Sequence, residues 1–180
     1  RESHRLVRLG RVARGLLHRL DCPVVVVPPD VEAKDLGAGP LVALASLADD
    51  SVEACRFAGR LAARLQRRLA VVHVVPLLDA GGLPYLPAES LGRLGREHRA
   101  EAAAQLEAWL AGHGLSCDER AVLEGQLLEQ AMAFAEAWGS PLLVTGSSRL
   151  SAVGRALHVS AGAELAAVAT IPVAVVPPRG

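Results

Sequence analysis

The chain is poor in aromatic residues and shows no excess of charge of either sign. Only 3% of its 180 residues are Phe, Trp or Tyr, and nineteen basic residues balance nineteen acidic ones. Proteins that bind nucleic acids usually carry an excess of positive charge, and those that bind single strands stack the bases on aromatic rings. The composition therefore argues against nucleic-acid binding. It also disfavours a flavin-dependent redox carrier, because few aromatic rings are present to stack on the flavin.

Cysteine is scarce as well. The three cysteines, Cys22, Cys55 and Cys117, are far apart and form no CxxC pair. This spacing suggests neither a zinc site nor a disulfide framework. We expect reduced, mostly buried thiols and a cytoplasmic location.

Long apolar runs are missing, although 51% of the residues are hydrophobic. No run approaches the roughly 20 residues that a membrane-spanning helix needs, and no signal-peptide pattern is present. We therefore expect a soluble protein without a membrane partner. Because the sequence starts at Arg1 without a Met, we also expect it to be part of a longer chain.

A short phrase occurs near both ends of the sequence. Residues 23–29 read PVVVVPP and residues 172–178 read PVAVVPP, so six of seven positions match at an offset of 149 residues. Each copy follows an Ala- and Leu-rich run typical of a helix, which makes the repeated unit a helix and a strand. We interpret residues 1–30 as the last helix and strand of one domain, 31–39 as a linker, and 40–180 as a complete domain.

Short apolar runs alternate with amphipathic stretches along this complete domain. Such alternation predicts an α/β fold: a doubly wound, five-stranded parallel sheet with helices on both faces. The run at 115–123 is the most polar, so it is expected at the sheet edge. The predicted strands are 40–46, 69–75, 115–123, 141–145 and 171–176, and the predicted helices are 49–68, 87–112, 126–138 and 154–169, the first of them capped by Asp49, Asp50 and Ser51.

Ligands of such sheets bind beyond the carboxyl ends of the strands, where the strand order reverses. The loop after the fourth predicted strand is the richest in suitable groups. It begins Gly146-Ser147-Ser148-Arg149, and Ser160 stands at the start of the last regular helical stretch. Glycine and serine ahead of a helix can offer backbone N–H groups and hydroxyls to an anion.

Several motifs together resemble the universal stress protein family. The resemblance is strongest in the last forty residues, where LVTG at 143–146, Ser160 and IPVAVV at 171–176 fall in the register of the family's closing segment. It implies the same doubly wound fold and a tandem arrangement, in which residues 4–28 match the closing segment of another copy. The remaining matches are VAL at 42–44 with Ser51, HVV at 73–75 and VLEG at 122–125, which includes Val122.

The resemblance also implies a nucleotide site, from which this sequence departs at three positions. Nucleotide-binding members carry the loop Gly-x2-Gly-x9-Gly-Ser/Thr and an Asp at the end of the first strand. Here Gly146 and Ser160 are kept, but Arg149 and Val159 replace the second and third glycines, and Ala45 replaces the Asp. A Cβ at the glycine positions obstructs the close approach of phosphate. We therefore expect weak or no ATP binding by the family's usual mode, and no other cofactor.

Two functions follow from these observations. The first is a non-catalytic stress-response module that acts through dimerisation and protein contacts. The second is an ATP-binding switch or weak ATPase in which Arg149 clamps a phosphate; alternatively, Arg149 fills the space of the nucleotide and pairs with a carboxylate. His73 is interpreted as a half-buried, hydrogen-bonded histidine and not as an acid–base catalyst. His98, His113 and His158 lack ligand spacing, so no metal is assigned.

The repeat predicts how the two ends of the chain meet. Members of the family pair through their fifth strands, so residues 24–27 are expected to lie antiparallel to 173–176 and to protect that edge. The helix at 11–20 would then expose Val12, Leu16 and Leu17 unless another chain covers them. A homo-oligomer formed through the fifth-strand edge is the expected consequence.

Overall fold

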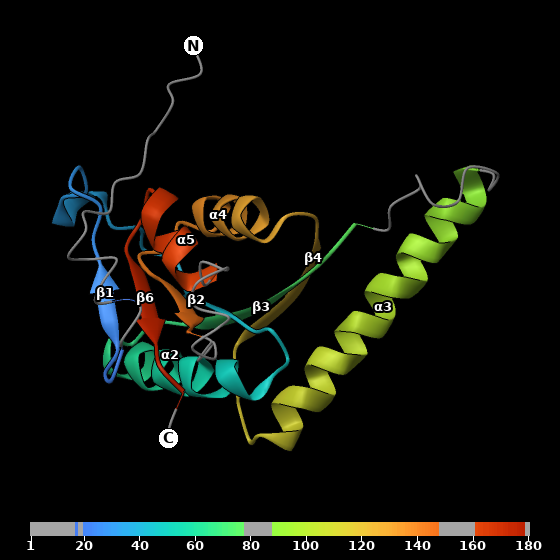
Figure 1. Cartoon of the computed structure of the whole chain (residues 1–180), viewed down its shortest axis with the longest axis horizontal. Coiled ribbons are helices and arrows are strands. Elements are labelled where there is room, and N and C mark those ends of the chain that lie inside the picture. The colour runs from blue at the N-terminus through green and yellow to red at the C-terminus, as the bar shows by residue number, and fades with distance from the viewer. Residues whose placement is uncertain (1–16, 18–19, 78–87, 148–160, 179–180) are drawn as a thin grey trace, which may run out of the picture.

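Six strands form one sheet in the computed structural model, which describes residues 17, 20–77, 88–147 and 161–178. The order across the sheet is β1-β6-β5-β2-β3-β4, with every neighbouring pair parallel except β1 and β6 (Figure 1). This confirms the predicted five-stranded parallel sheet with an added antiparallel strand. The strands are β1 (Val24–Val26), β2 (Leu41–Leu44), β3 (Leu69–Val75), β4 (Glu119–Glu124), β5 (Leu143–Gly146) and β6 (Val173–Val176).

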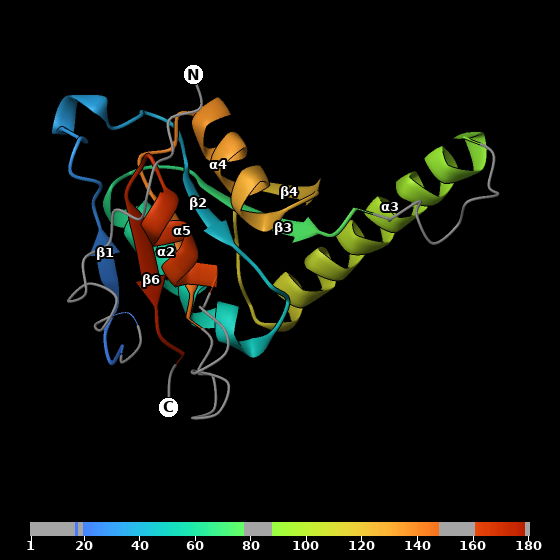
Figure 2. The same ribbon diagram turned by 45° about the horizontal axis from the view of Figure 1, so that its top comes forward.

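Helices cover both faces of this sheet, as predicted. Successive side chains along a strand point to opposite faces of the sheet. Because helices cover both faces, β2, β5 and β6 carry apolar side chains on both sides. α4 and α5 lie on one face and α2 on the other (Figures 1 and 2). One apolar cluster includes residues of α4 and α5, and the other includes residues of α2 and of the second half of α3. The helices are α2 (Val52–Arg64), α3 (Ala88–Gly112), α4 (Leu127–Ala137) and α5 (Ala161–Val168), with 3₁₀ turns η1 (Ala33–Asp35) and η2 (Asp49–Ser51).

Helix α3 is only half packed. Among the residues of α3 whose burial is described, the buried ones are Ala102, Leu106 and Leu110, and all three lie in its second half. The first half runs away from the sheet (Figure 1), and Leu94 there is exposed. No described helix is long and apolar enough to cross a membrane.

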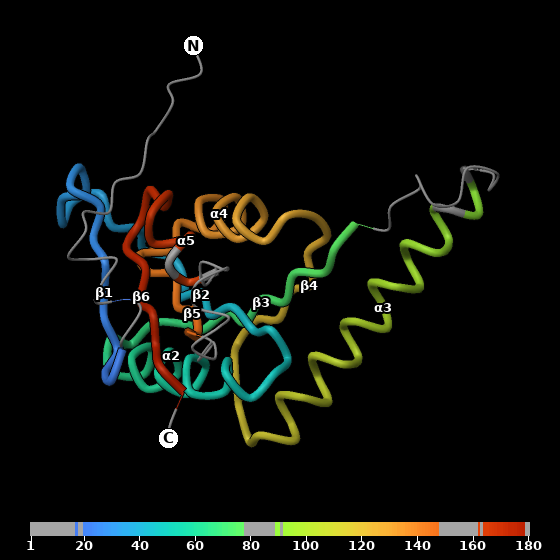
Figure 3. The backbone as a smooth tube through the Cα atoms, in the orientation of Figure 1, coloured from blue at the N-terminus to red at the C-terminus, as the bar shows by residue number. Residues whose placement is uncertain are grey.

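The two predicted edge strands lie where they were expected. β4 is the outer strand on one side, and β1 pairs antiparallel with β6 on the other, with Val24 opposite Val175 and Val26 opposite Val173 (Figure 3). β1 thus fills the edge of β6 within the same chain. The expected homo-oligomer stays a prediction, and the free edge on this side belongs to β1.

One expectation about the N-terminal helix is wrong. Leu17 is buried, and it packs with Leu20, Val26 and Leu165 into the cluster beneath α5. The chain's own core therefore covers Leu17, because β1 and β6 bring the two closing segments together. Val12 and Leu16 lie outside the described residues. The assignment of 1–30 to a preceding domain stays a prediction.

The predicted linker at 31–39 is fixed to the domain. The amide of Gly39 donates to the carbonyl of Gly139 at 2.8 Å. Arg67 Nη1 donates to the carbonyls of Gly37 and Gly39, each at 3.1 Å. The end of the linker is therefore bonded to the segments that follow α2 and α4.

Gly39→Ala is expected to lower the free energy of unfolding by about 1–3 kcal/mol, because a Cβ there overlaps the carbonyl oxygen of Trp138 and the backbone must shift. Urea denaturation measures the change. The control is Gly95→Ala in α3, where a Cβ meets nothing within 4 Å and the higher helix propensity of alanine should raise stability by up to about 1 kcal/mol. Equal effects of the two substitutions would contradict the packing argument.

Candidate functional site

A cleft of about 270 Å³ lies beyond the carboxyl ends of β2, β3 and β5. β2 has β3 on one side and β5 on the other, so the chain reverses its direction of winding at this point. The cleft therefore occupies the place where doubly wound sheets bind ligands. Its described lining residues are Leu44, Ala45, Ser46, Asp50, Ser51, Val72, His73, Val74, Leu127, Thr145 and Gly146.

One wall of the cleft is a polar turn between β2 and α2. The Ser46 hydroxyl donates to Asp50 Oδ1 at 2.8 Å, and the Ser46 amide donates to Ser51 Oγ at 3.2 Å. Leu47 closes the turn with a φ of 63°, a left-handed conformation that is uncommon for leucine. Neither Ser46 nor Asp50 was predicted from the sequence as a ligand residue. The position of Ser46 shortly after a buried strand was the available signal.

The residues expected to cap α2 act differently. Asp49, Asp50 and Ser51 form the 3₁₀ turn η2, and no side-chain capping hydrogen bond is present at η2 or at the start of α2. The Ser51 hydroxyl donates back to the carbonyl of Ala48 at 2.9 Å. The hydroxyl thus stabilises the turn that forms the wall of the cleft.

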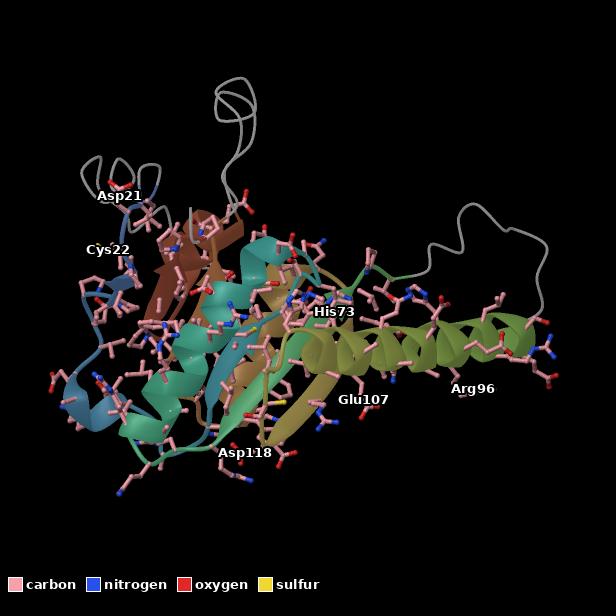
Figure 4. All side chains as sticks on the ribbon, turned by 90° about the horizontal axis from the view of Figure 1, so that it is seen from below. Asp21, Cys22, His73, Arg96, Glu107 and Asp118 are labelled. Carbon is pink, nitrogen blue, oxygen red and sulfur yellow. The ribbon has the colours of Figure 1, made fainter. Side chains whose placement is uncertain are left out.

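His73 lies at the end of β3, as Figure 4 shows near the centre of the molecule. Its Nδ1 is 2.8 Å from the carbonyl oxygen of Ala45, and the imidazole is half-buried. Because a carbonyl only accepts, this ring nitrogen carries the hydrogen. The expectation of a half-buried, hydrogen-bonded histidine is confirmed. Its bond ties the ends of β2 and β3 together.

The side chain of Ala45 is only 4% exposed and belongs to the apolar cluster under α2. Its amide donates to the carbonyl of Val72 at 2.9 Å. Both backbone groups of Ala45 are therefore engaged with β3. The position where nucleotide-binding members have an Asp contributes only a methyl group to this cleft.

The end of β5 forms the opposite wall. A Cβ on Gly146 would lie 2.5 Å from the carbonyl oxygen of Asp50, so glycine is needed for the close approach of β5 to η2. The amide of Ser147 donates to the carbonyl of Val176 at 2.8 Å, and the residue is buried. That amide is therefore already engaged. Ser148, Arg149, Val159 and Ser160 lie outside the described residues, and their roles stay predictions.

Val122 does not line the cleft described here. It stands opposite His73 in the register of β3 and β4, and its side chain packs against the cluster under α2. Two residues further on, Glu124 pairs with Arg99 of α3 at 2.7 Å. The hydrogen bond to this carboxylate raises the pKa of the Arg99 guanidinium. The last residue of β4 is thus in contact with the middle of α3.

Among the lining residues described, only Asp50 and His73 are ionisable, and neither Arg nor Lys is present. A carboxylate and hydroxyl groups suit a ligand that donates hydrogen bonds better than a phosphate. Over the described ranges, no group of three His, Cys, Asp or Glu side chains is placed to hold a metal ion.

Solved structures share this fold at low sequence identity. The chain is 16% identical to a universal stress protein from Archaeoglobus fulgidus, with a TM-score of 0.63, 93% of this chain covered and 54% of that one. A functionally unknown protein from Pseudomonas aeruginosa gives 18% identity, a TM-score of 0.64 and coverage of 94% and 57%. This chain thus spans about half the length of these two.

A third structure matches over nearly its full length. It is a universal stress protein in complex with cAMP, with 17% identity, a TM-score of 0.56, and coverage of 79% of this chain and 99% of that one. Comparison with curated proteins gave no match. The sequence profile of the universal stress protein family matches residues 41–177, which include all five parallel strands and their helices. The chain therefore belongs to the universal stress protein family.

Proposed function

We propose that this chain is a non-catalytic stress-response module that acts through contacts with other proteins. The carrying observation is that the polar groups of the cleft bind one another. Ser46 is bonded to Asp50 and Ser51, and Nδ1 of His73 is occupied by a carbonyl. The described cleft holds one hydroxyl–carboxylate contact, between Ser46 and Asp50, but Nδ1 of His73 is bonded to the carbonyl of Ala45 and not to this hydroxyl. These bonds therefore assemble no Ser–His–carboxylate arrangement of the kind that activates a serine.

The same wall disfavours a triphosphate. Asp50 places a carboxylate in the cleft, and no Arg or Lys among the described lining residues balances it. Ala45 lacks the carboxylate of nucleotide-binding members, and the Ser147 amide is not free to bind an anion.

The second candidate function is an ATP-binding switch or weak ATPase. It is supported by the position of the cleft at the switch point of the sheet and by the retained Gly146. In this case Arg149 supplies the positive charge that the described lining residues lack. The cAMP complex shows that a protein of this fold holds a nucleotide, and whether this chain does so is a matter for titration.

Calorimetric titration with ATP and magnesium separates the two functions. We expect no heat of binding at protein concentrations that detect a Kd on the order of tens of micromolar. The double substitution Arg149→Gly and Val159→Gly should then create affinity, because it restores the glycines that phosphate approach requires.

The control for this titration is Arg96→Ala, which changes an exposed arginine on the projecting half of α3 (Figure 4). It should leave the result unchanged. One-to-one binding by the unaltered chain that is lost in Arg149→Ala would establish the switch instead.

We place this module in the cytoplasm, because its three cysteines are all unpaired and free thiols are typical of reducing compartments. Cys55 is buried as expected, whereas Cys22 is exposed. An exposed thiol at the β1 end of the chain is better tolerated where the surroundings keep it reduced.

A further inference from the structure

The outer face of α2 carries a row of arginines. The opposite face of this helix packs into the apolar cluster that it shares with the second half of α3. In Figure 4 α2 lies in front of the sheet, with no described helix or strand across its outer side. Arg56, Arg60 and Arg64 are exposed there. They follow one another at intervals of four residues, which places them in one row along the helix.

Two of these arginines have no ionic partner among the described residues. Arg56 pairs with Glu53 at 2.8 Å, whereas no ion pair or hydrogen bond involves the side chain of Arg60 or Arg64 within that part of the chain. Arg60 has an arginine four residues before it and another four residues after it, and like charges at this spacing destabilise a helix. Three exposed arginines elsewhere each pair with a glutamate, namely Arg68, Arg99 and Arg120.

Carboxylates gather at the other end of the same helix. Asp49 and Asp50 belong to the turn η2 that precedes α2, and Glu53 lies in the first turn of α2. Together with Arg56 they line a groove of about 400 Å³. Three carboxylates share this groove with one arginine. The face of α2 therefore runs from an acidic end to a basic end.

The dipole of the helix accounts for only part of this order. Acidic groups near the N-terminus and basic groups in the last turn stabilise a helix, which covers Asp49, Glu53 and Arg64. Arg60 lies one turn further in, where the dipole has little effect. Its charge is therefore free to serve a contact with another molecule.

We infer that two copies of this chain associate through the outer faces of their α2 helices, which lie antiparallel about a two-fold axis beside Phe57. The basic end of each helix then lies over the acidic end of the other. Arg64 and Asp50 are equally far from Phe57 in the sequence, so Arg64 of one copy comes opposite Asp50 of the other. Arg60 lies beside the same groove, and the half-buried Phe57 meets its own counterpart.

A second copy fits this face better than a uniformly acidic partner does. Asp49 and Glu53 lie beside the arginines and would repel such a partner, whereas a second copy presents both signs of charge in the reverse order. Arginine suits a groove lined by carboxylates, because its guanidinium can bind a carboxylate through two parallel hydrogen bonds. Exposed ion pairs contribute little each, so we expect weak association, with a Kd on the order of 100 µM.

Sedimentation equilibrium of the 180-residue chain measures this association. The average mass should rise from that of a monomer at about 10 µM toward that of a dimer at about 1 mM. The rise should be smaller at about 0.5 M salt, because salt screens exposed charges.

Charge reversal tests the pairing of the two ends. Arg60→Glu with Arg64→Glu makes the face more acidic, and Asp49→Arg makes it more basic. Asp49 is chosen because it is exposed and does not line the cleft beyond β2. Each variant should self-associate at least about tenfold more weakly, because every substitution occurs twice in a two-fold contact and sets like charges against each other.

The two variants should bind each other when they are mixed. Their faces are then opposite in charge, and fluorescence anisotropy with one variant labelled measures a one-to-one complex. The matched control is Arg93→Glu with Arg96→Glu, which changes the net charge equally at exposed positions on the projecting half of α3 (Figure 4). This control should self-associate like the unaltered chain. Circular dichroism verifies that each variant is folded.

Three results would overturn the inference. The chain could stay monomeric over the whole concentration range, or the folded variants could fail to bind each other. Association could also persist in Arg60→Glu with Arg64→Glu and disappear in Val25→Lys with Val27→Lys, which would place the contact at β1. The inference goes beyond the proposed function, and the ATP titration tests that function independently of α2.

Discussion

Replacing Leu143 by alanine is expected to lower the free energy of unfolding by about 2–5 kcal/mol. Leu143 is completely buried in the cluster under α4 and α5. Its strand, β5, pairs with both β2 and β6, so the backbone on either side cannot easily move to fill the cavity. Urea denaturation followed by circular dichroism measures the loss.

The control for this substitution is Leu94→Ala. Leu94 lies on the projecting half of α3 and is exposed, so its removal should change stability by no more than about 0.5 kcal/mol. A large loss at Leu94, or a negligible one at Leu143, would mean that the sheet and α3 are packed differently from the arrangement described.

The second large effect concerns Cys55 and alkaline pH. Burial, together with the nearby Cys117, raises the pKa of the Cys55 thiol from the ordinary value of 9.0 to about 12. The native protein therefore keeps this thiol protonated where the unfolded chain loses the proton. The resulting stabilisation is fully present below pH 9 and is lost as pH rises toward 12. At pH 10.5 the loss should reach about 2 kcal/mol.

Cys55→Ala isolates this contribution. Other groups titrate in the same pH window in both proteins, so only the difference between them reports on Cys55. The free energy of unfolding is measured by urea at pH 8 and at pH 10.5, and it should fall by about 2 kcal/mol more in the unaltered chain. Equal losses would show that the thiol is ionised freely in the native state.

The hydrophobic pattern predicts a strand most accurately where a strong local signal, such as a proline, marks its end. β3 was predicted with its observed bounds, because an unbroken apolar run ends at Pro76. β4 begins four residues later than predicted. The amide of Leu115 closes α3 by donating to Leu110, and Asp118 accepts a hydrogen bond from the amide of Leu69. The bond between Asp118 and Leu69 joins segments 49 residues apart, and a local pattern does not contain such a contact.

The sequence predicted where the cleft lies, but it did not predict which polar residues line it. Strand order put the cleft beyond β2 and β5, and Ala45 and Gly146 do line it. The polar wall was missed because it depends on the left-handed turn at Leu47, a conformation that leucine rarely adopts. Leu17 was predicted to be exposed for a different reason. Its burial follows from the pairing of β1 with β6. That pairing was predicted, but its effect on the residues before β1 was not.

The pairing of β1 with β6 joins segments separated by almost the whole chain. During synthesis β1 is made before β6, and most of the residues described here lie between the two strands. Until β6 is made, a bare run of valines stays unpaired, which is the kind of segment that promotes aggregation. Prolines at positions 23, 28 and 29 flank this run, and since they cannot donate to a ladder they limit how far a wrong pairing spreads. β1 is thus made long before the strand that secures it, and its flanking prolines limit wrong pairing until β6 is made.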